Sequence, residues 1–409
     1  MTALLLERAT ILDVRAGTRL PERHLLIEDG RIKEIADRPI RASEARRIDL
    51  GGLTLMPGLC DAHVHVTAAT ASFPDLMRWS PMYVAARAGD ILHGMLMRGF
   101  TTVRDCGGAD YGLARAVEQG YLAGPRILFS GHAISQTGGH GDMRGPGETF
   151  EQCTCCAGLG VVADGVAAVR KACREEIRKG AHFIKIMASG GVSSPTDRIG
   201  NTQFSLDEIT AAVEEAAAAE CYVAAHVYTA RAAARALACG VRSIEHGNLI
   251  DEAAMDLLVE KQAFLVPTMS THEMLGREGV AAGMPKEMCD KVFEVVEAGK
   301  RTHAKAAARG VRMVYGTDLL GSMHRHQLLE FSIRSAFHSP LQLIQSATLH
   351  AAALFQREGE IGVVEPGARA DLLAVEGDPL ADIAVLQDPE RRLKLILKDG
   401  VIHKDALSS

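Results

Sequence analysis

Residues 56–66 read Met56-Pro57-Gly58-Leu59-Cys60-Asp61-Ala62-His63-Val64-His65-Val66, and they decide how the rest of the sequence is interpreted. Two histidines, separated by one residue, stand in an apolar run that follows a Pro-Gly turn. In a β-strand, residues i and i+2 point to the same face. His63 and His65 would therefore converge on one point, as a metal site requires. The alternative is a strand that carries two histidines with no ligand role, and only the other residues of the chain distinguish the two.

The composition indicates a globular chain of 409 residues, long enough for one large and one smaller domain. A formal net charge of −6 gives no reason to expect a nucleic-acid partner. No apolar run approaches membrane-spanning length, and the N-terminus lacks the basic region of a signal peptide. The cysteines are thinly spread and indicate free thiols in a reducing compartment, and Cys153-Thr154-Cys155-Cys156 has no second cluster at zinc-site spacing. We therefore expect a cytoplasmic protein.

Both chain ends predict short β-strands. Asp29-Gly30 separates two apolar runs, and Asp399-Gly400 does the same near the C-terminus. Asp-Gly between such runs is typical of a tight hairpin. Neither end alone has enough strands for a stable sheet. We therefore predict one small composite β-domain, a β-sandwich, built from residues 1–57 and 361–409.

Between the ends, residues 58–360 alternate strand-like and helix-like segments. Strands are expected at 98–105, 126–130, 182–187, 222–226, 243–246, 263–266 and 312–316. Helices are expected at 165–179, ending at Gly180, after the capping box of Ser205 and Glu208, at 229–239, and over much of 268–310. Alternation of this length indicates a parallel sheet, and we predict a distorted (β/α)8 TIM barrel in preference to a doubly wound sheet. Neither a dinucleotide-binding glycine motif nor a Gly-x-Ser-x-Gly elbow is present.

Several potential ligands stand at the ends of the expected strands, where a barrel places its chemistry. They are His63, His65, Lys185, His226, His246 and Asp318. Singly, a strand histidine is more often a satisfied core residue, and Gly316-Thr317-Asp318 could be a turn. A lysine inside Phe-Ile-Lys-Ile-Met is harder to dismiss, because a buried ammonium without a partner is costly.

Jointly, these six positions resemble the binuclear pattern of the amidohydrolase superfamily. The matching contexts are Asp61-Ala62-His63-Val64-His65, Ile184-Lys185, Ala225-His226, Glu245-His246-Gly247 and Gly316-Thr317-Asp318. The resemblance implies two divalent metal ions, most plainly Zn²⁺, with His63, His65 and Asp318 on the first and His226 and His246 on the second. It also implies that Lys185 is carboxylated and bridges both metals. Asp318 would then take a proton from the attacking water and return it to the leaving nitrogen.

Three further stretches are similar to the imidazolonepropionase-related branch that contains metal-dependent dipeptidases. They are Thr137-Gly138-Gly139-His140-Gly141-Asp142, Ala188-Ser189-Gly190-Gly191-Val192 and His226-Val227-Tyr228. The resemblance implies that Tyr228 reaches the scissile carbonyl and that His140 lies on the substrate. Deaminases of the superfamily carry a Glu three residues after the strand-five histidine and lack the lysine, whereas this chain has Thr229 and Lys185. Both features favour amide hydrolysis.

Specificity depends on the loop after the lysine strand. In that loop, Arg198 could bind a substrate carboxylate and Asp197 could bind a cationic side chain, although both could equally be solvated. His324-Arg325-His326 is expected at the substrate rim or surface. We expect a homo-oligomeric hydrolase of dipeptides or N-acyl amino acids, first of all an Xaa-Pro dipeptidase (a prolidase). The alternatives are an Xaa-Arg or Xaa-Lys dipeptidase, an ochratoxin-type amidase, and a cyclic amide or imidazolone hydrolase.

Overall fold

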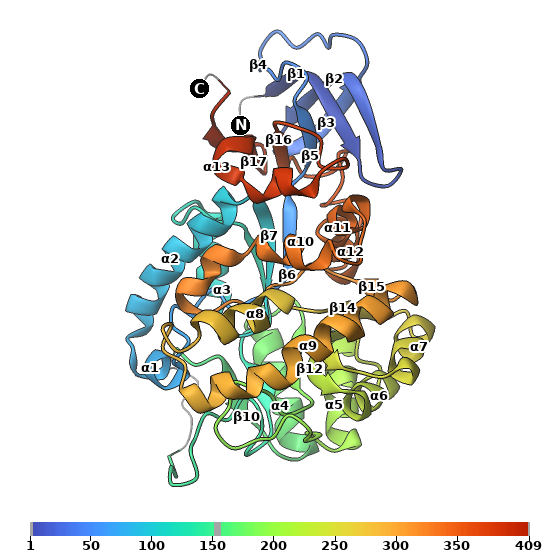
Figure 1. The fold of residues 1–409 in the computed structure, drawn as a ribbon. Coiled ribbons are helices and arrows are strands. Elements are labelled where there is room, and N and C mark those ends of the chain that lie inside the picture. Colours follow the sequence, from blue (N-terminus) through green and yellow to red (C-terminus); the bar gives the residue numbers. More distant parts are fainter. Residues whose placement is uncertain (1–2, 151–156, 408–409) are drawn as a thin grey trace.

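The computed structural model describes residues 3–150 and 157–407, and Figure 1 shows how they are arranged. Strands from both chain ends lie together at one end of the molecule, next to a larger part in which strands and helices alternate. The strands are β1 (Leu4–Asp13), β2 (Thr18–Glu28), β3 (Arg31–Ala36), β4 (Arg46–Asp49), β5 (Thr54–Pro57), β6 (Leu59–Val64), β7 (Phe100–Asp105), β8 (Arg126–Phe129), β9 (Ala133–Ser135), β10 (Gly160–Val162), β11 (Ile184–Met187), β12 (Val223–Thr229), β13 (Ser243–Leu249), β14 (Phe264–Val266), β15 (Arg312–Met313), β16 (Leu372–Val375), β17 (Leu393–Lys398) and β18 (Val401–Asp405).

The helices cover the larger part. They are α1 (Phe73–Arg78), α2 (Pro81–Met97), α3 (Tyr111–Glu118), α4 (Val166–Arg178), α5 (Leu206–Ala218), α6 (Ala230–Ala238), α7 (Glu252–Glu260), α8 (Met269–Glu278), α9 (Lys286–Ala308), α10 (Leu329–Arg334), α11 (Pro340–Ser346), α12 (Leu349–Leu354) and α13 (Pro389–Arg392), with 3-10 turns η1 (Gly321–His326) and η2 (Ile383–Gln387). Among the described residues, no helix combines the length and apolar character needed to cross a membrane.

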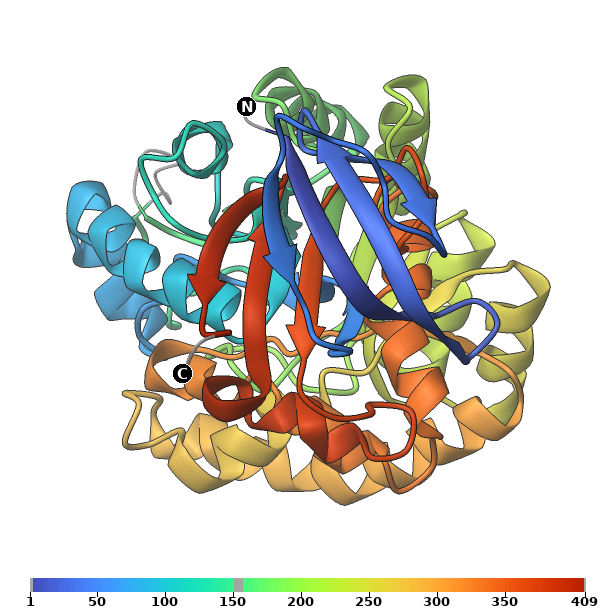
Figure 2. The same cartoon turned by 90° about the horizontal axis from the view of Figure 1, so that it is seen from above.

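The terminal strands form one sheet from both ends of the chain. Its order is β18-β17-β16-β5-β1-β2-β3, with β4 paired to β1, so the last strands of the sequence lie beside β5 near residue 57 (Figure 2). Strand ladders connect all of these strands, and no separate second sheet appears among the described residues of this part. The predicted pairing of the two ends is therefore confirmed, whereas the division into two facing layers stays a prediction.

Two Asp-Gly turns fix the register of this sheet. Asp29 and Gly30 have φ of 50° and 75°, and Asp399 and Gly400 have φ of 49° and 74°. Positive φ at both central residues is the geometry of a two-residue hairpin turn whose twist matches the strands. The predicted hairpins β2–β3 and β17–β18 are thus confirmed, with Glu28 opposite Arg31 and Lys398 opposite Val401.

The middle of the chain builds two parallel sheets. One has the order β6-β7-β8 and the other β10-β9-β11-β12-β13-β14-β15. Hydrogen bonds between residues in or next to the strands join the two sheets on both sides, from His182 N–H to Phe129 O (2.8 Å) on one side and from Ala62 N–H to Tyr315 O (2.7 Å) and Asp318 N–H to His63 O (2.7 Å) on the other. The predicted parallel α/β architecture is confirmed, but among the described residues no continuous ladder closes the strands into a ring.

Local sequence features explain where the helices begin and end. The Ser205 side chain and the Glu208 backbone N–H form the predicted capping box at the start of α5. Helix α4 ends just before Gly180, whose φ of 94° is one that a residue with a Cβ adopts at a cost. The segment 268–310 is helical as expected. The short strands β9 and β10 are too brief to be recognised in the sequence.

Strand register brings the candidate ligands together. Lys185 on β11 pairs with Ala224 on the neighbouring strand β12, and Met187 pairs with His226. Lys185 and His226 therefore lie on adjacent strands, offset by two residues. His226 then pairs with Glu245, and Val227 with His246. Because all these strands are parallel, their carboxyl ends meet at the same edge.

We predict that Leu373→Ala lowers the free energy of unfolding by about 2–5 kcal/mol. Leu373 is fully buried on β16, opposite Met56 from the N-terminal part and Ile396 from the C-terminal part, so its truncation leaves a cavity where the chain ends meet. The matched control is Val401→Ala on the edge strand β18, where the side chain is 46% exposed and a change within about 0.5 kcal/mol is expected. Urea unfolding measures both variants, and equal losses would contradict the packing described here.

Candidate active site

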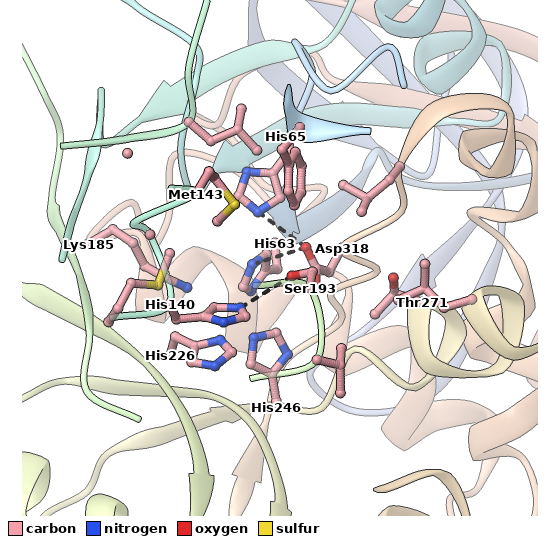
Figure 3. A pocket seen from close by; sticks show the side chains of 18 of the residues that line it. His63, His65, His140, Met143, Lys185, Ser193, His226, His246, Thr271 and Asp318 are labelled. Atoms are coloured by element: carbon pink, nitrogen blue, oxygen red, sulfur yellow. Dashed lines mark hydrogen bonds and ion pairs between the residues drawn. The ribbon is translucent and has the colours of Figure 1, made fainter. Parts of the chain in front are cut away.

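A cavity opens at the carboxyl ends of the parallel strands, and the predicted ligands line it (Figure 3). Its polar wall consists of His63, His65, His140, Lys185, Ser193, His226, Tyr228, His246, Thr271, His272 and Asp318. Its apolar wall consists of Phe73, Leu76, Met77, Met143, Leu159, Met187, Val192, Leu275 and Leu320. All six predicted metal ligands are therefore brought to one place from six different positions along the chain.

His63 and His65 each present one ring nitrogen to this cavity. The Nδ1 of His65 lies 2.8 Å from the carbonyl oxygen of Gly107, which can only accept, so Nδ1 carries the hydrogen. The Nδ1 of His63 lies 2.7 Å from a carboxylate oxygen of Glu245 and donates in the same way. Each Nε2 is left facing the Oδ1 of Asp318, at 3.5 Å for His63 and 3.2 Å for His65.

The lone pairs of the two Nε2 atoms therefore face the lone pairs of the Asp318 carboxylate oxygen. A positive charge between these atoms would relieve their repulsion. Burial lowers the pKa of His63 to about 4, so its ring is neutral at neutral pH. Burial alone would raise the pKa of Asp318, but the neighbouring His63 and His65 outweigh it and hold this pKa at about 2. Burial lowers the pKa of His65, but the adjacent Asp318 carboxylate outweighs it and raises this pKa, so a positive charge is favoured at this point. Imidazole nitrogens and an ionised carboxylate are the donor set that Zn²⁺ prefers. The residues present thus fit a divalent cation.

His226 and His246 complete the histidine cluster from β12 and β13. Their ring centroids are 4.6 Å apart, and His246 lies 5.1 Å from His63. His226 donates its Nε2 hydrogen to Gly190 O (3.2 Å), and His246 Nδ1 is bonded to Thr268 Oγ1 (2.7 Å), so each ring keeps one further nitrogen for a ligand role. Burial lowers the pKa of both rings well below the usual value. The ligand atoms of His63, His246 and Asp318 lie within 4.8 Å of one another.

Lys185 reaches the same cavity from β11 (Figure 3). Its side chain is only 1% exposed, and among the described residues its amine has no hydrogen-bond or ion-pair partner. A buried ammonium without a partner is unfavourable. A carbamate on this nitrogen would carry negative charge and two oxygen atoms, which suits a position next to cation ligands.

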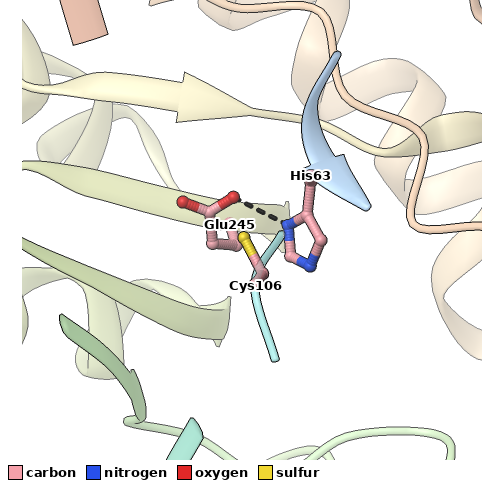
Figure 4. A group of neighbouring side chains, drawn as sticks. All are labelled: His63, Cys106 and Glu245. Atoms are coloured by element: carbon pink, nitrogen blue, oxygen red, sulfur yellow. Dashed lines mark hydrogen bonds and ion pairs between the residues drawn. The ribbon is translucent and has the colours of Figure 1, made fainter. Parts of the chain in front are cut away.

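Glu245 and Arg104 support the site, and the sequence pattern did not reveal this role. Both side chains are fully buried, and Arg104 Nη2 donates to Glu245 Oε1 at 2.7 Å while Glu245 Oε2 holds His63. Cys106 lies beside this pair, and one potential ligand atom each of His63, Cys106 and Glu245 lie within 4.8 Å of one another (Figure 4). Burial raises the pKa of the Cys106 thiol to about 12, so the thiol stays protonated and is a poor metal ligand. Glu245 is already paired with Arg104 and His63, so its role is to orient the His63 ring.

His140 lines the cavity, which is compatible with the substrate contact expected of it, whereas Arg198 does not line it. The His140 ring stacks on His226 with centroids 4.0 Å apart, and its Nδ1 lies 2.7 Å from Ser194 Oγ. Ser194 in turn donates to Asp197, a buried carboxylate that also accepts from the backbone N–H of Gly191 (3.1 Å). Asp197 thus fixes the loop that carries His140, whereas the exposed Arg198 contributes nothing to the cavity lining.

Tyr228 is buried beside His246, with ring centroids 5.3 Å apart. Its hydroxyl lies 2.7 Å from Nε2 of His272, a cavity residue that no sequence motif identified. A buried histidine on an otherwise ordinary helix gives no pattern that sequence reasoning could use.

The remaining sequence candidates lie away from the ligands. His324 is buried against the carbonyl of Ala68 (3.2 Å), and His326 pairs with Glu278 (3.0 Å). Neither lines the cavity, and the expectation that this stretch lies at the substrate rim or surface is wrong for His324, which is buried by packing of η1 against the loop of Ala68. Cys153, Cys155 and Cys156 lie outside the described residues.

Comparison with known proteins identifies the family. The model of the family described as "Amidohydrolase family" matches residues 54–402. Ochratoxinase from Aspergillus niger is 34% identical over 365 residues, which cover 86% of this chain and 75% of that protein.

Solved structures are similar over the whole chain. A prolidase complexed with N-methylphosphonate-L-proline is 48% identical, with a TM-score of 0.96, and the match covers 99% of this chain and 100% of that one. A Xaa-Pro dipeptidase with methionine bound in its active site is 31% identical, with a TM-score of 0.88 and coverage of 98% and 100%. With the ligand cluster described above, these likenesses lead to one conclusion: the chain belongs to the amidohydrolase family and is a hydrolase that acts on amide bonds.

Proposed function

We propose that this chain is a binuclear metal-dependent dipeptidase that cleaves the amide bond next to a free carboxylate, with Xaa-Pro dipeptides as its first substrates. One observation carries the proposal. The Nε2 atoms of His63 and His65 lie 3.5 Å and 3.2 Å from Oδ1 of Asp318, in a cavity with a partly apolar wall. The 48% identical prolidase, which matches the chain from end to end, supports the substrate class. The (β/α)8 barrel over 58–360 and the terminal β-sandwich belong to the same proposal, supported by the parallel sheets and the shared terminal sheet.

The metal ligands in this proposal are those of the histidine cluster. His63, His65 and Asp318 would hold one cation, His226 and His246 the other, and a carboxylated Lys185 would bridge them. Two divalent cations would polarise the scissile carbonyl and lower the pKa of water enough to make it a nucleophile near neutral pH. Glu245 and Gly107 hold the rings of His63 and His65 so that the ligand atoms stay aimed at one point.

Asp318 is the proton carrier of the proposed reaction. Its carboxylate is 20% exposed, so it faces the cavity and stays accessible to water. Its carboxylate is ionised and can take a proton from the attacking water, and its position next to the ligands lets it return that proton to the leaving nitrogen. Its backbone has φ of 55°, a strained conformation that a non-glycine residue adopts where surrounding contacts enforce it.

The cavity wall favours an apolar residue on the substrate. Among the described lining residues Asp318 is the sole acid, and Asp197 is buried in its own loop. Methionine, leucine, valine and phenylalanine side chains form the apolar part of the wall, so a proline or another apolar residue fits better than an arginine or lysine. The same wall supports a second candidate, an ochratoxin-type amidase, because the Aspergillus niger ochratoxinase is 34% identical.

We predict that Lys185→Ala loses the bound metal ions and nearly all hydrolysis, because the bridge between the two ligand sets is removed. Short carboxylic acids added to the variant should restore part of the activity by taking the place of the carbamate. Metal analysis of purified protein and a dipeptide assay measure both effects. Lys398→Ala is the matched control, since Lys398 is also buried but bonds to the carbonyl of Gly124 (2.8 Å) and does not line the cavity. Full metal content in the Lys185 variant would refute the assignment.

We predict that Asp318→Asn lowers kcat by about 10²–10⁴-fold, the range expected when a positioned acid–base group is lost. The amide is nearly isosteric with the carboxylate, so the fold should be preserved, which thermal unfolding can check. Steady-state kinetics on the best dipeptide provide the measurement. A change confined to KM would show that Asp318 binds the substrate without moving a proton.

We predict that substrates with an apolar C-terminal residue have a kcat/KM at least about tenfold higher than those ending in lysine or arginine, since an unpaired charge in this wall costs more than 1.4 kcal/mol. The measurement is a dipeptide series with a constant alanine first and proline, phenylalanine, lysine or arginine second. A preference for the basic residues would contradict the interpretation of the cavity wall.

A further inference from the structure

The hydrogen bond between Tyr228 and His272 has a defined direction. His272 Nδ1 lies 2.9 Å from the carbonyl oxygen of Thr268, which can only accept, so Nδ1 carries the ring hydrogen. The His272 ring is buried and no carboxylate is hydrogen-bonded to it among the described residues, so a second ring hydrogen would create a buried cation without a counter-charge in contact. Its Nε2 is therefore bare, and the Tyr228 hydroxyl, 2.7 Å away, must be the donor.

Both side chains are built into the wall of the cavity. Each is 2% exposed, and both line the same space as the metal-ligand candidates. The Tyr228 ring stacks on His246, and the His272 ring meets His246 edge-on with centroids 5.7 Å apart. The contact therefore lies beside the histidine cluster and not at the surface.

Thr268 ties this pair to the cluster. Its side-chain oxygen lies 2.7 Å from His246 Nδ1, while its main-chain carbonyl accepts from His272. Thr268 lies at the junction of β14 and α8 with φ of 46°, a left-handed conformation in which its side chain contacts His246 and its carbonyl contacts His272. One residue thus sets the positions of His246 and of the His272–Tyr228 pair.

We propose that His272 is a positioning residue that acts through Tyr228, fixing the direction of its hydroxyl group beside the reacting amide. With the hydroxyl hydrogen directed to His272, the phenol oxygen presents its lone pairs to the cavity. The leaving nitrogen gains a hydrogen as the amide bond breaks, and these lone pairs can accept a hydrogen bond from it only while the hydroxyl stays directed to His272. His272 therefore fixes Tyr228 as an acceptor toward the reacting amide, in place of the contact with the scissile carbonyl that the sequence resemblance implied. The inference rests on the proposed function, since it concerns amide hydrolysis at this site.

Two substitutions separate the two bonds of His272. In His272→Asn the shorter amide can still donate to the Thr268 carbonyl but does not reach Tyr228. In His272→Gln the longer side chain can place its amide oxygen where Nε2 was and accept from Tyr228. We expect the Asn variant to lose about tenfold in kcat/KM, the change that corresponds to one well-placed hydrogen bond. The loss should fall mainly on kcat, because the cavity wall is unchanged. The Gln variant should stay within about threefold of the wild type by the same reasoning.

A double-mutant cycle decides whether His272 acts through Tyr228. In the Tyr228→Phe background, His272→Asn should have no further effect on kcat/KM, because the hydroxyl that it positions is gone. Independent losses that multiply, or an Asn variant as active as the wild type, would overturn the proposal. The matched control is His324→Asn, a buried histidine that also contacts a main-chain carbonyl but neither lines the cavity nor touches Tyr228. Its cycle with Tyr228→Phe should be additive.

A spectroscopic measurement tests the geometry without any substrate. In protein labelled with ¹⁵N-histidine, His272 should show the tautomer with hydrogen on Nδ1, identified by the signal that disappears in His272→Asn. Tyr228→Phe should shift the Nε2 resonance, because its hydrogen-bond donor is removed. If no Xaa-Pro substrate is cleaved, the proposed function fails, and these resonances still decide the positioning proposal. Hydrogen on Nε2, or an unmoved resonance in Tyr228→Phe, would refute it.

Discussion

The site depends on the buried ion pair between Arg104 and Glu245. Neither side chain reaches solvent, and Arg104 also donates to the carbonyl of Ala62 (2.6 Å) and to Ser243 (3.1 Å). Three strands, β6, β7 and β13, are joined through this one guanidinium. Removal of either partner would leave an uncompensated buried charge, a change that typically costs about 3–5 kcal/mol. Because Glu245 also holds His63, the same pair that fixes the strands aims the first candidate metal ligand.

Three residues at or next to the cavity have a left-handed backbone conformation. His246, Thr268 and Asp318 have φ of 73°, 46° and 55°, each in the left-handed region that side chains disfavour by about 1–3 kcal/mol. Local bonds enforce these conformations: the Asp318 N–H donates to the His63 carbonyl at 2.7 Å, and His303 donates to the His246 carbonyl at 2.7 Å. His246 and Asp318 line the cavity, so at these two positions the left-handed turn presents the side chain of the same residue to it.

The cavity combines a polar floor with an apolar wall. The floor consists of histidines, a carboxylate and a buried lysine, and burial lowers the pKa of His63, His226 and His246. The wall supplies no acid except Asp318 among the described residues, so selection among substrates depends on shape and apolar contact. Asp197 is acidic and lies in the loop after β11, but it does not line the cavity. Its carboxylate instead accepts from the backbone N–H of Gly191 and contacts His140, which holds His140 in place.

The sequence by itself determined the elements whose chemistry is local. Asp-Gly turns predicted both terminal hairpins, strand–helix alternation predicted the parallel sheets, and residue type and spacing picked out His63, His65 and Lys185 as potential ligands. The tertiary structure alone decided which side chains stand behind them. Arg104, Glu245 and His272 carry no motif, because their roles come from contacts between strands and helices far apart in the chain. Arg198 shows the converse: its residue type suited a substrate carboxylate, but the loop directs it to solvent, and only packing sets that direction.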